Sequence, residues 1–463
     1  MKLSTSRITT FSMMLVLSSC AMGPDYERPE VPVPDTFLEP STVGASIANL
    51  KWWELFQNEE LTDLIELALG NNKEVAIAMA RIEEARATLG FVRADQLPNL
   101  DGAAGASRGN NILGAGLPGS INETFVLAGN LSFELDLWGK LRRSTEAARA
   151  ELLATVEARN VVTITLIADV ASVYLLLLDL DERVRIAQRT METRHDSLLI
   201  IQARFEKGTV ALIDVNQAEI ELADATAQLA ALKRENQRTE NLLSVLLGQN
   251  PGTVIRTRGK EEKLLPLEIP AGLPSELLQR RPDIRQASQQ LAAQTARIGL
   301  AEALRFPSLS LTGTLGLAST ELDDFFSSDN KTWGLSANLL GPIFDAGRTK
   351  SQVEAERART EQALKNYELT VLRAFQEVED SLIDISTFRE EAVARHRQVT
   401  AARSALKLSF ARYNGGVTSY LEVLEADRSL FRVELLASST SRQQIVSIIG
   451  LYKALGGGWL TEE

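Results

Sequence analysis

Several stretches of the chain alternate apolar and polar side chains. In residues 308–317, leucines at alternate positions are separated by serine and threonine, and residues 332–343 continue the same pattern. A period of two is that of a strand with one apolar face and one polar face. The first half of the chain repeats the pattern at residues 123–136 and, more weakly, at the Gly/Ala-rich residues 100–107. The sequence therefore predicts four strands in two pairs, each pair joined by a loop rich in glycine, asparagine and serine.

Long segments without glycine or proline follow each predicted strand pair. Residues 140–207 and 349–414 contain neither, so each segment is free to form one helix of about 100 Å at 1.5 Å per residue. The returning segments after them lack both residues as well. We therefore predict two helical hairpins, over about 140–247 and 348–449, with turns at Gly208 and at Gly415–Gly416.

The most apolar part of the first long segment is residues 166–180. It is too short to span a membrane as a helix, and it contains Asp169 and Asp179. We interpret it as a packing seam between helices of a coiled coil.

Comparison of the chain with itself shows a duplication at an offset of about 208 residues. The segment Ala203–Gly208 aligns with Ala411–Gly416, and Gly139 with Gly347. Two related repeats therefore make up most of the protein. The predicted organisation is a first repeat at 61–250, a linker at 251–274, a second repeat at 275–455 and a tail at 456–463.

Neither the strands nor the helices of one chain are self-sufficient. Strands of about 10 residues are long enough to cross a bilayer at a tilt, and about 8 strands make the smallest membrane barrel. A single strand of this kind would equally fit a soluble sandwich, but two matched pairs favour membrane staves. Four strands cannot close a barrel, and hairpins this long have too little internal core to stand alone. We therefore predict an α+β membrane protein whose barrel is shared between chains.

The N-terminus has the features of a lipoprotein signal. Lys2 and Arg7 precede a short apolar stretch, and the sequence Leu17-Ser18-Ser19-Cys20 resembles the box in which a bacterial signal peptidase leaves an acylated cysteine. We predict a signal peptide at 1–19, lipidation of Cys20, and an extended, proline-rich tether at 20–60. The alternative is a leftover thiol in a plain secretory signal. As the only cysteine, Cys20 excludes a disulfide framework or a cysteine-cluster metal site.

Charge and composition argue against several other classes of function. The formal net charge of −12 is unsuited to nucleic acid as a partner. The two histidines, His195 and His396, are isolated among charged neighbours within the long helical segments, and no glycine-rich loop is followed by Lys and Ser/Thr. We therefore expect no enzyme activity, no cofactor and no metal site.

Three motifs, taken in order with the duplicated hairpins, resemble a known family. They are Gly23-Pro24-Asp25-Tyr26, Trp52-Trp53-Glu54-Leu55-Phe56 and Leu278-Gln279-Arg280-Arg281-Pro282-Asp283-Ile284-Arg285. Together they resemble the TolC-like outer-membrane factors, in particular the NodT-type lipoproteins paired with resistance-nodulation-division pumps. The resemblance covers nearly the whole chain. The stretch Arg280–Asp283 itself is interpreted as a helix start, because Pro282 suits a first turn and Asp283 favours the helix dipole.

The resemblance implies a homotrimer. Four strands per chain would form a 12-stranded barrel in the outer membrane, continuous with a periplasmic α-helical barrel of coiled-coil hairpins. The trimer would be the exit duct of a tripartite efflux pump, working with a periplasmic adaptor and an inner-membrane pump, and closed at its periplasmic end. The alternatives are a duct for type I protein secretion or metal efflux, and a periplasmic coiled-coil lipoprotein scaffold without a pore.

The resemblance also implies a gate near the hairpin turns, built from acidic residues that favour cations. The matching positions here are Asp214, Glu422 and Glu425, with Tyr413 where the family's latch commonly has a tyrosine. Where some relatives have an arginine just after the glycine turn, this chain has Thr418, which favours rings of carboxylates over an ion-pair latch. The alternative is that the three acids are simply solvated helix residues.

The same resemblance places the adaptor contact at the hairpin tips. The tip residues are Arg204, Gly208, Arg412 and Gly416. Glycine permits a turn with positive φ, and an exposed arginine offers a charged contact. The two arginines could equally cap the C-termini of their helices.

Overall fold

The structure is a computed structural model, which describes residues 21–34, 36–38, 53, 56, 58–109, 122–254, 256 and 274–457. The predicted signal peptide, Cys20, most of the linker at 251–274 and most of the tail lie outside the described residues. The chain divides into two compact units, at 1–31, 80–156 and 286–369 for the first and at 32–79, 157–285 and 370–463 for the second. Each unit therefore draws on both halves of the sequence.

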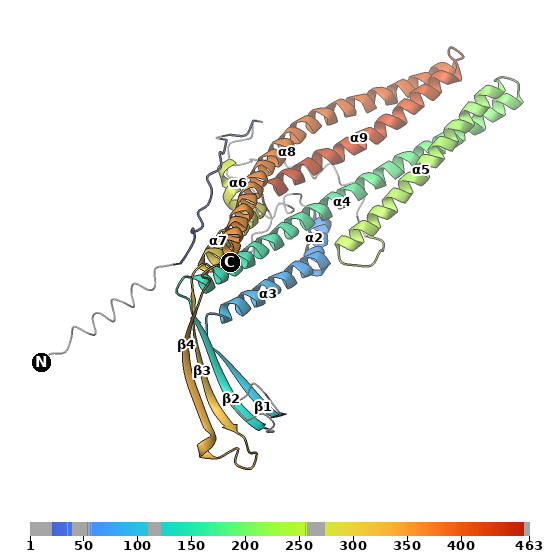
Figure 1. The fold of residues 1–463 in the computed structure, drawn as a ribbon. Coiled ribbons are helices and arrows are strands. Elements are labelled where there is room, and N and C mark those ends of the chain that lie inside the picture. Colours follow the sequence, from blue (N-terminus) through green and yellow to red (C-terminus); the bar gives the residue numbers. More distant parts are fainter. Residues whose placement is uncertain are drawn as a thin grey trace. The chain divides into compact units, whose positions relative to one another are not determined.

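The strands of the first unit form one antiparallel sheet in the order β1-β2-β3-β4 (Figure 1). Their bounds are Asn99–Gly109 for β1, Asn122–Leu135 for β2, Ser308–Ser319 for β3 and Lys331–Leu340 for β4. The β1–β2 and β3–β4 pairs are joined by pairing of β2 with β3, in which Phe125 opposes Ser319 and Leu131 opposes Gly313. The four predicted strands therefore belong to one sheet.

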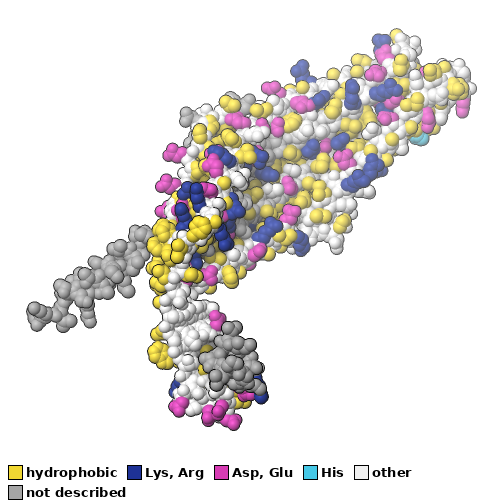
Figure 2. All heavy atoms as spheres, viewed as in Figure 1, with side chains coloured by type: hydrophobic (Ala, Val, Ile, Leu, Met, Phe, Trp, Pro, Cys, Tyr) yellow, Lys and Arg dark blue, Asp and Glu magenta, His cyan; other side chains and the backbone are white. Residues whose placement is uncertain are grey.

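The register gives the sheet one apolar face and one polar face. Leu131, Leu315, Trp333 and Leu335 share a face with most of the other leucines, and many of these side chains are exposed. On the opposite face, the hydroxyl groups of Thr312 and Ser336 are 2.6 Å apart, and Thr314 donates to Asn130 at 3.0 Å. Few charged side chains lie along the strands in Figure 2, and several gather at their loop end. This distribution suits a membrane stave with lipid on one side and water on the other.

The strands at the two margins of the sheet, β1 and β4, have no neighbour on their outer sides among the described residues. Their outward N–H and C=O groups need partners if the sheet lies in lipid. A second and a third copy of the same sheet can supply those partners.

Each half of the chain has the same order of elements. In the first half, α2 (Glu59–Asn71) and α3 (Lys73–Ala94) precede the strands, and α4 (Lys140–Glu206) and α5 (Leu212–Leu246) follow them. In the second half the corresponding helices are α6 (Pro274–Arg280), α7 (Pro282–Ala303), α8 (Arg348–Asn414) and α9 (Tyr420–Ala454).

The two hairpin turns have the same hydrogen-bond pattern. At the end of α4, Thr209 N–H donates to Arg204 O at 3.0 Å and Gly208 N–H to Phe205 O at 2.8 Å. Val417 and Gly416 repeat both bonds at the end of α8. This is the Schellman motif, which needs a residue in the left-handed region, and the φ angles of Gly208 and Gly416 are +70° and +71°. The repeated glycines therefore end both long helices in the same way.

The core of the second unit includes the apolar middle of α4. By length and composition, α4 contains an 18-residue window that could cross a membrane, but 56% of that window is buried in the protein. Leu177 and Tyr174 pack with Ile65 of α2 and with Ile449 and Tyr452 of α9. The stretch therefore serves as protein core.

The start of α7 is fixed by a buried arginine. Arg281 precedes Pro282, the first residue of α7, and donates to Ala454 O at 2.7 Å and to both carboxylate oxygens of Asp283. A further ion pair of 2.8 Å joins it to Glu377 of α8. Arg281 thereby ties α7 to the end of α9 and to α8.

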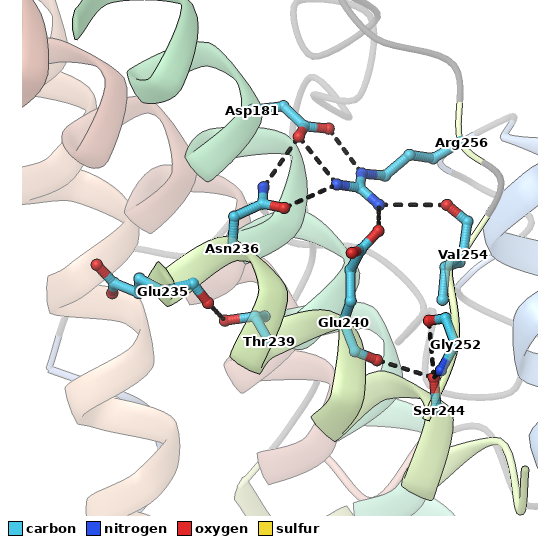
Figure 3. Close-up of polar contacts among 9 residues, drawn as sticks. All are labelled: Asp181, Glu235, Asn236, Thr239, Glu240, Ser244, Gly252, Val254 and Arg256. Atoms are coloured by element: carbon cyan, nitrogen blue, oxygen red, sulfur yellow. Dashed lines mark hydrogen bonds and ion pairs between the residues drawn. The ribbon is translucent and has the colours of Figure 1, made fainter. Parts of the chain in front are cut away.

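A second buried arginine, Arg256, connects α4 and α5 near the C-terminal end of α5 (Figure 3). Arg256 contacts Asp181 of α4 at 2.6 and 2.9 Å and Glu240 of α5 at 2.6 Å. Asn236 of α5 bridges the same pair by donating to Asp181 at 2.9 Å. Arg256, in the segment that follows α5, is therefore bonded to both helices of the hairpin.

The two-faced sheet predicts that arginine on its apolar face prevents insertion. We expect Leu335→Arg to reduce the heat-modifiable trimer in outer-membrane fractions strongly, because a cation facing lipid costs about 2–4 kcal/mol at mid-bilayer. The neighbouring Ser336→Arg, on the polar face, is the matched control and should leave most of the trimer. Equal trimer yields for the two variants would contradict the assignment of the faces.

Candidate gate at the hairpin turns

The end of α4 is bonded to the end of α8. The Arg204 guanidinium lies over the ring of Tyr413, 5.0 Å from its centroid, and Nη2 donates to Asn414 Oδ1 at 3.1 Å. The Tyr413 ring in turn lies 5.3 Å from that of Tyr420, the first residue of α9. The structure thus brings together a predicted adaptor residue, Arg204, and a predicted latch residue, Tyr413, and joins the two hairpins at their turns.

Within the second hairpin, an ion pair joins its two helices. Arg412 Nε lies 3.1 Å from Glu422 Oε1, and the hydroxyl group of Thr418 donates to the other carboxylate oxygen. Thr418 therefore does not prevent an ion pair within the chain, because Arg412 supplies the cation. Both charged side chains are about half exposed, so the pair contributes only about 0–1 kcal/mol.

The three predicted gate acids have different surroundings. Asp214 accepts a hydrogen bond of 3.1 Å from the backbone N–H of Ala211, at the start of α5. Glu425 is well exposed, with Arg428 at 3.9 Å. Asp214 therefore satisfies a free N–H at its own helix end, whereas Glu422 and Glu425 are near arginines. Gly208 and Gly416 occupy the left-handed turn positions described above.

Buried ion pairs lie further from the turns and were not predicted. Arg194 of α4 is only 5% exposed and binds Asp427 of α9 at 2.8 Å. It also binds α5, through the backbone oxygen of Glu221 at 2.8 Å and its carboxylate at 3.2 Å. Its guanidinium lies 5.3 Å from the centroid of the Phe431 ring. One arginine thus connects three helices.

The carboxylates around Arg194 are shared with a second arginine. Arg428 of α9 donates to Glu221 at 2.6 Å, so Glu221 is bonded to arginines from both hairpins. Burial raises the pKa of Asp427, and Arg194 opposes that effect. Burial, and after it the negative charge of Asp427, raises the pKa of Tyr420 to about 12. The buried charges are therefore interdependent, and removing one leaves others without compensation.

A second contact of this kind lies two helical turns further along α9. Glu434, which is buried, binds Arg189 of α4 at 2.6 Å and Arg403 of α8 at 2.8 Å. We refer to the Arg194 and Glu434 contacts together as the inter-hairpin lock. A sequence signal for it exists only in the spacing of Asp427 and Glu434, seven residues apart on one face of α9.

Comparison with known proteins shows the family to which the chain is similar. A family model described as "Outer membrane efflux protein" matches residues 64–249 and 273–457. The chain is 35% identical over 459 residues to outer membrane protein OprJ of Pseudomonas aeruginosa, which covers 98% of this chain and 96% of OprJ. It is 33% identical over 462 residues to cation efflux system protein CusC of Escherichia coli (strain K12), covering 98% of this chain and 100% of CusC.

The solved structure of a membrane protein from Pseudomonas aeruginosa matches the fold with a TM-score of 0.87. The two chains are 35% identical, and the match covers 94% of this chain and 100% of that one. Proteins of this kind are trimeric outer-membrane channels with a helical barrel, which work with a periplasmic adaptor and an inner-membrane pump. The predicted fold class, with four strands per chain, is confirmed. The chain belongs to the outer membrane efflux protein family.

Proposed function

We propose that three copies of this chain form the exit duct of a tripartite efflux pump in the outer membrane. Each copy contributes its four strands to a shared barrel and its two hairpins to a tunnel through the periplasm. The observation that carries the proposal is the single sheet, which has an apolar face, a polar face and two margins that no other described strand pairs with. Transport through such a duct is passive, so the chain needs no catalytic residue and the pump supplies the energy.

The proposal has a direct test in the membrane and in the cell. We expect outer-membrane fractions to contain a heat-modifiable trimer that conducts ions in planar bilayers. Deleting the gene should raise sensitivity to at least one class of drugs, dyes or metals. A soluble, water-washed monomer without conductance would contradict the proposal and favour a periplasmic scaffold.

The inter-hairpin lock keeps the two hairpins of one chain side by side. Removing one partner of a buried charge pair costs about 3–5 kcal/mol, because the other charge stays buried. The exposed contacts at the turns are worth much less. Substitutions in the lock are therefore expected to be more costly than substitutions at the turns, and the exposed contacts at the turns are the ones that can open first.

The lock predicts that its central arginine keeps the channel closed. We expect Arg194→Ala to raise the conductance of trimers in planar bilayers and to sensitise cells to large antibiotics, because Asp427 and Glu221 lose their common partner. Arg194→Lys should have an intermediate effect. The matched control is Arg185→Ala, since exposed Arg185 pairs with Glu182 of its own helix. Conductance of Arg194→Ala no higher than that of the control would remove the lock from the gate.

We also propose that Asp214, Glu422 and Glu425 form rings of carboxylates where three copies meet, with Tyr413 beside them. Like charges repeated around an axis repel one another and attract cations. The adaptor would contact the turns through Arg204, Gly208, Arg412 and Gly416. Exposed apolar side chains adjoin the turns, among them Ile213, Val417 and Leu421, and support a protein contact there.

The carboxylate rings predict a change in ion selectivity. Changing Asp214, Glu422 and Glu425 together to Ala should increase conductance and weaken cation preference, measured as the reversal potential in a salt gradient.

The control for this variant changes Glu59, Asp63 and Glu66 of α2 to Ala. It removes the same charge far along the chain from the turns, and we expect selectivity like that of the wild type. An unchanged reversal potential in the first variant would show that the three acids are ordinary solvated residues.

A further inference from the structure

The first described residues of the chain are bound to the start of α4. Met22 N–H donates to Trp138 O at 3.0 Å. Arg143, of which only 4% of the side chain is exposed, donates through Nε to Met22 O at 3.0 Å and through Nη2 to Gly23 O at 3.1 Å. Nη2 also lies 2.8 Å from Asp25 Oδ1. A buried arginine therefore recognises the backbone of this segment.

Three glycines from separate parts of the chain make room for this contact. A Cβ atom on Gly299 of α7 would lie 2.3 Å from Met22 O, and one on Gly23 would lie 2.4 Å from the Cα atom of Gly299. A Cβ atom on Gly139 would lie 2.7 Å from the Cα atom of Ala21. The φ angles of Gly23 and Gly139 are also positive, at +85° and +76°. The segment thus lies in a site shaped for backbone alone.

The site lies where the sheet ends and the helices begin. Trp138, which accepts the Met22 bond, lies between the end of β2 and the start of α4, and its ring stacks on Phe306 at 4.7 Å. Its indole N–H donates to Pro307 O at 2.8 Å, just before β3. Aromatic rings with a polar handle at strand ends are typical of a membrane interface. The site therefore lies at the periplasmic end of the part of the sheet that suits lipid.

Two further hydrogen bonds hold the residues that follow Asp25 against α7 and α8. The hydroxyl groups of Tyr26 and Ser288 of α7 are 2.7 Å apart, and Arg28 Nε donates to the hydroxyl group of Tyr367 of α8 at 3.3 Å. The segment that we predicted as a tether is thus bonded to the protein from its first described residues.

We propose that Arg143, with Gly299 and Gly139, forms a seat that holds acylated Cys20 at the membrane boundary and so sets the depth of the barrel. Cys20 directly precedes Ala21 in the sequence, and two residues span at most about 7 Å, so the lipid has little slack relative to the seat. An acyl chain on a slack tether would hold the protein near the membrane without fixing its depth. The inference rests on the lipidation of Cys20.

The seat is tested by amide exchange and by thiol labelling of the purified, lipidated trimer. Arg143→Ala, and separately Gly299→Ala, should speed exchange of the Met22 amide at least tenfold, the factor that about 1.4 kcal/mol represents. Arg142→Ala is the matched control, because the Arg142 side chain donates to Asp136 and not, among the described residues, to the segment at Met22 and Gly23. The second readout uses Leu339→Cys, whose thiol would be the only free one in the mature protein and lies on the apolar face of β4.

In opened outer-membrane fragments, whose periplasmic face is accessible, we expect a membrane-impermeant maleimide to label Leu339→Cys several-fold faster when Arg143→Ala or Gly299→Ala is added, and no faster with Arg142→Ala. Unchanged Met22 exchange in both variants would overturn the seat. Faster exchange with unchanged labelling would overturn its role in setting depth. The conductance of the same trimers is measured separately. If wild-type trimers do not conduct, the proposed channel function is contradicted, while the exchange data still decide whether the seat exists.

Discussion

The two margins of the four-stranded sheet, which have no partner strand among the described residues, impose the strongest constraint on this protein. Water can satisfy the outward N–H and C=O groups of β1 and β4 only if the sheet stays out of lipid, yet its leucine-rich face and Trp333 favour lipid. Both demands are met when other copies pair with those margins and the sheet closes on itself. Trimer formation is thus part of folding, and the polar face with Thr312, Thr314 and Ser336 becomes the wall of an aqueous pore.

The helical hairpins contain two kinds of ion pair, some buried and some exposed to solvent. The pair of Arg412 and Glu422 is open to solvent, whereas Arg194 and Glu221 are buried against each other and buried Glu434 is paired with Arg189 and Arg403. A channel needs both kinds of contact. Buried ion pairs hold the two helical hairpins in register. Solvent-exposed ion pairs at the turns can be replaced by ion pairs with a partner protein.

Local patterns were enough to predict the strands, the long helices and their turns, because a period of two, an absence of glycine and proline, and a repeated Gly208/Gly416 are all visible in short segments. The roles of single charged residues were harder to predict. Arg194 looks like any solvated helix arginine, and its partner Asp427 lies 233 residues away. Arg412 and Glu422 were given separate roles, but they bind each other, because the turn returns the chain onto itself. Gly23 and Tyr26 were predicted within an extended tether, because their partners, Arg143 of α4 and Ser288 of α7, lie far away in the sequence.

The interleaving of the two compact units bears on how the protein reaches the membrane. Each unit combines segments from both halves of the chain, and β2 finds its neighbour β3 only after the whole first hairpin has been made. Contacts of such long sequence separation form slowly. The sheet therefore cannot be completed before β3 and β4, in the second half of the chain, have been synthesised and exported.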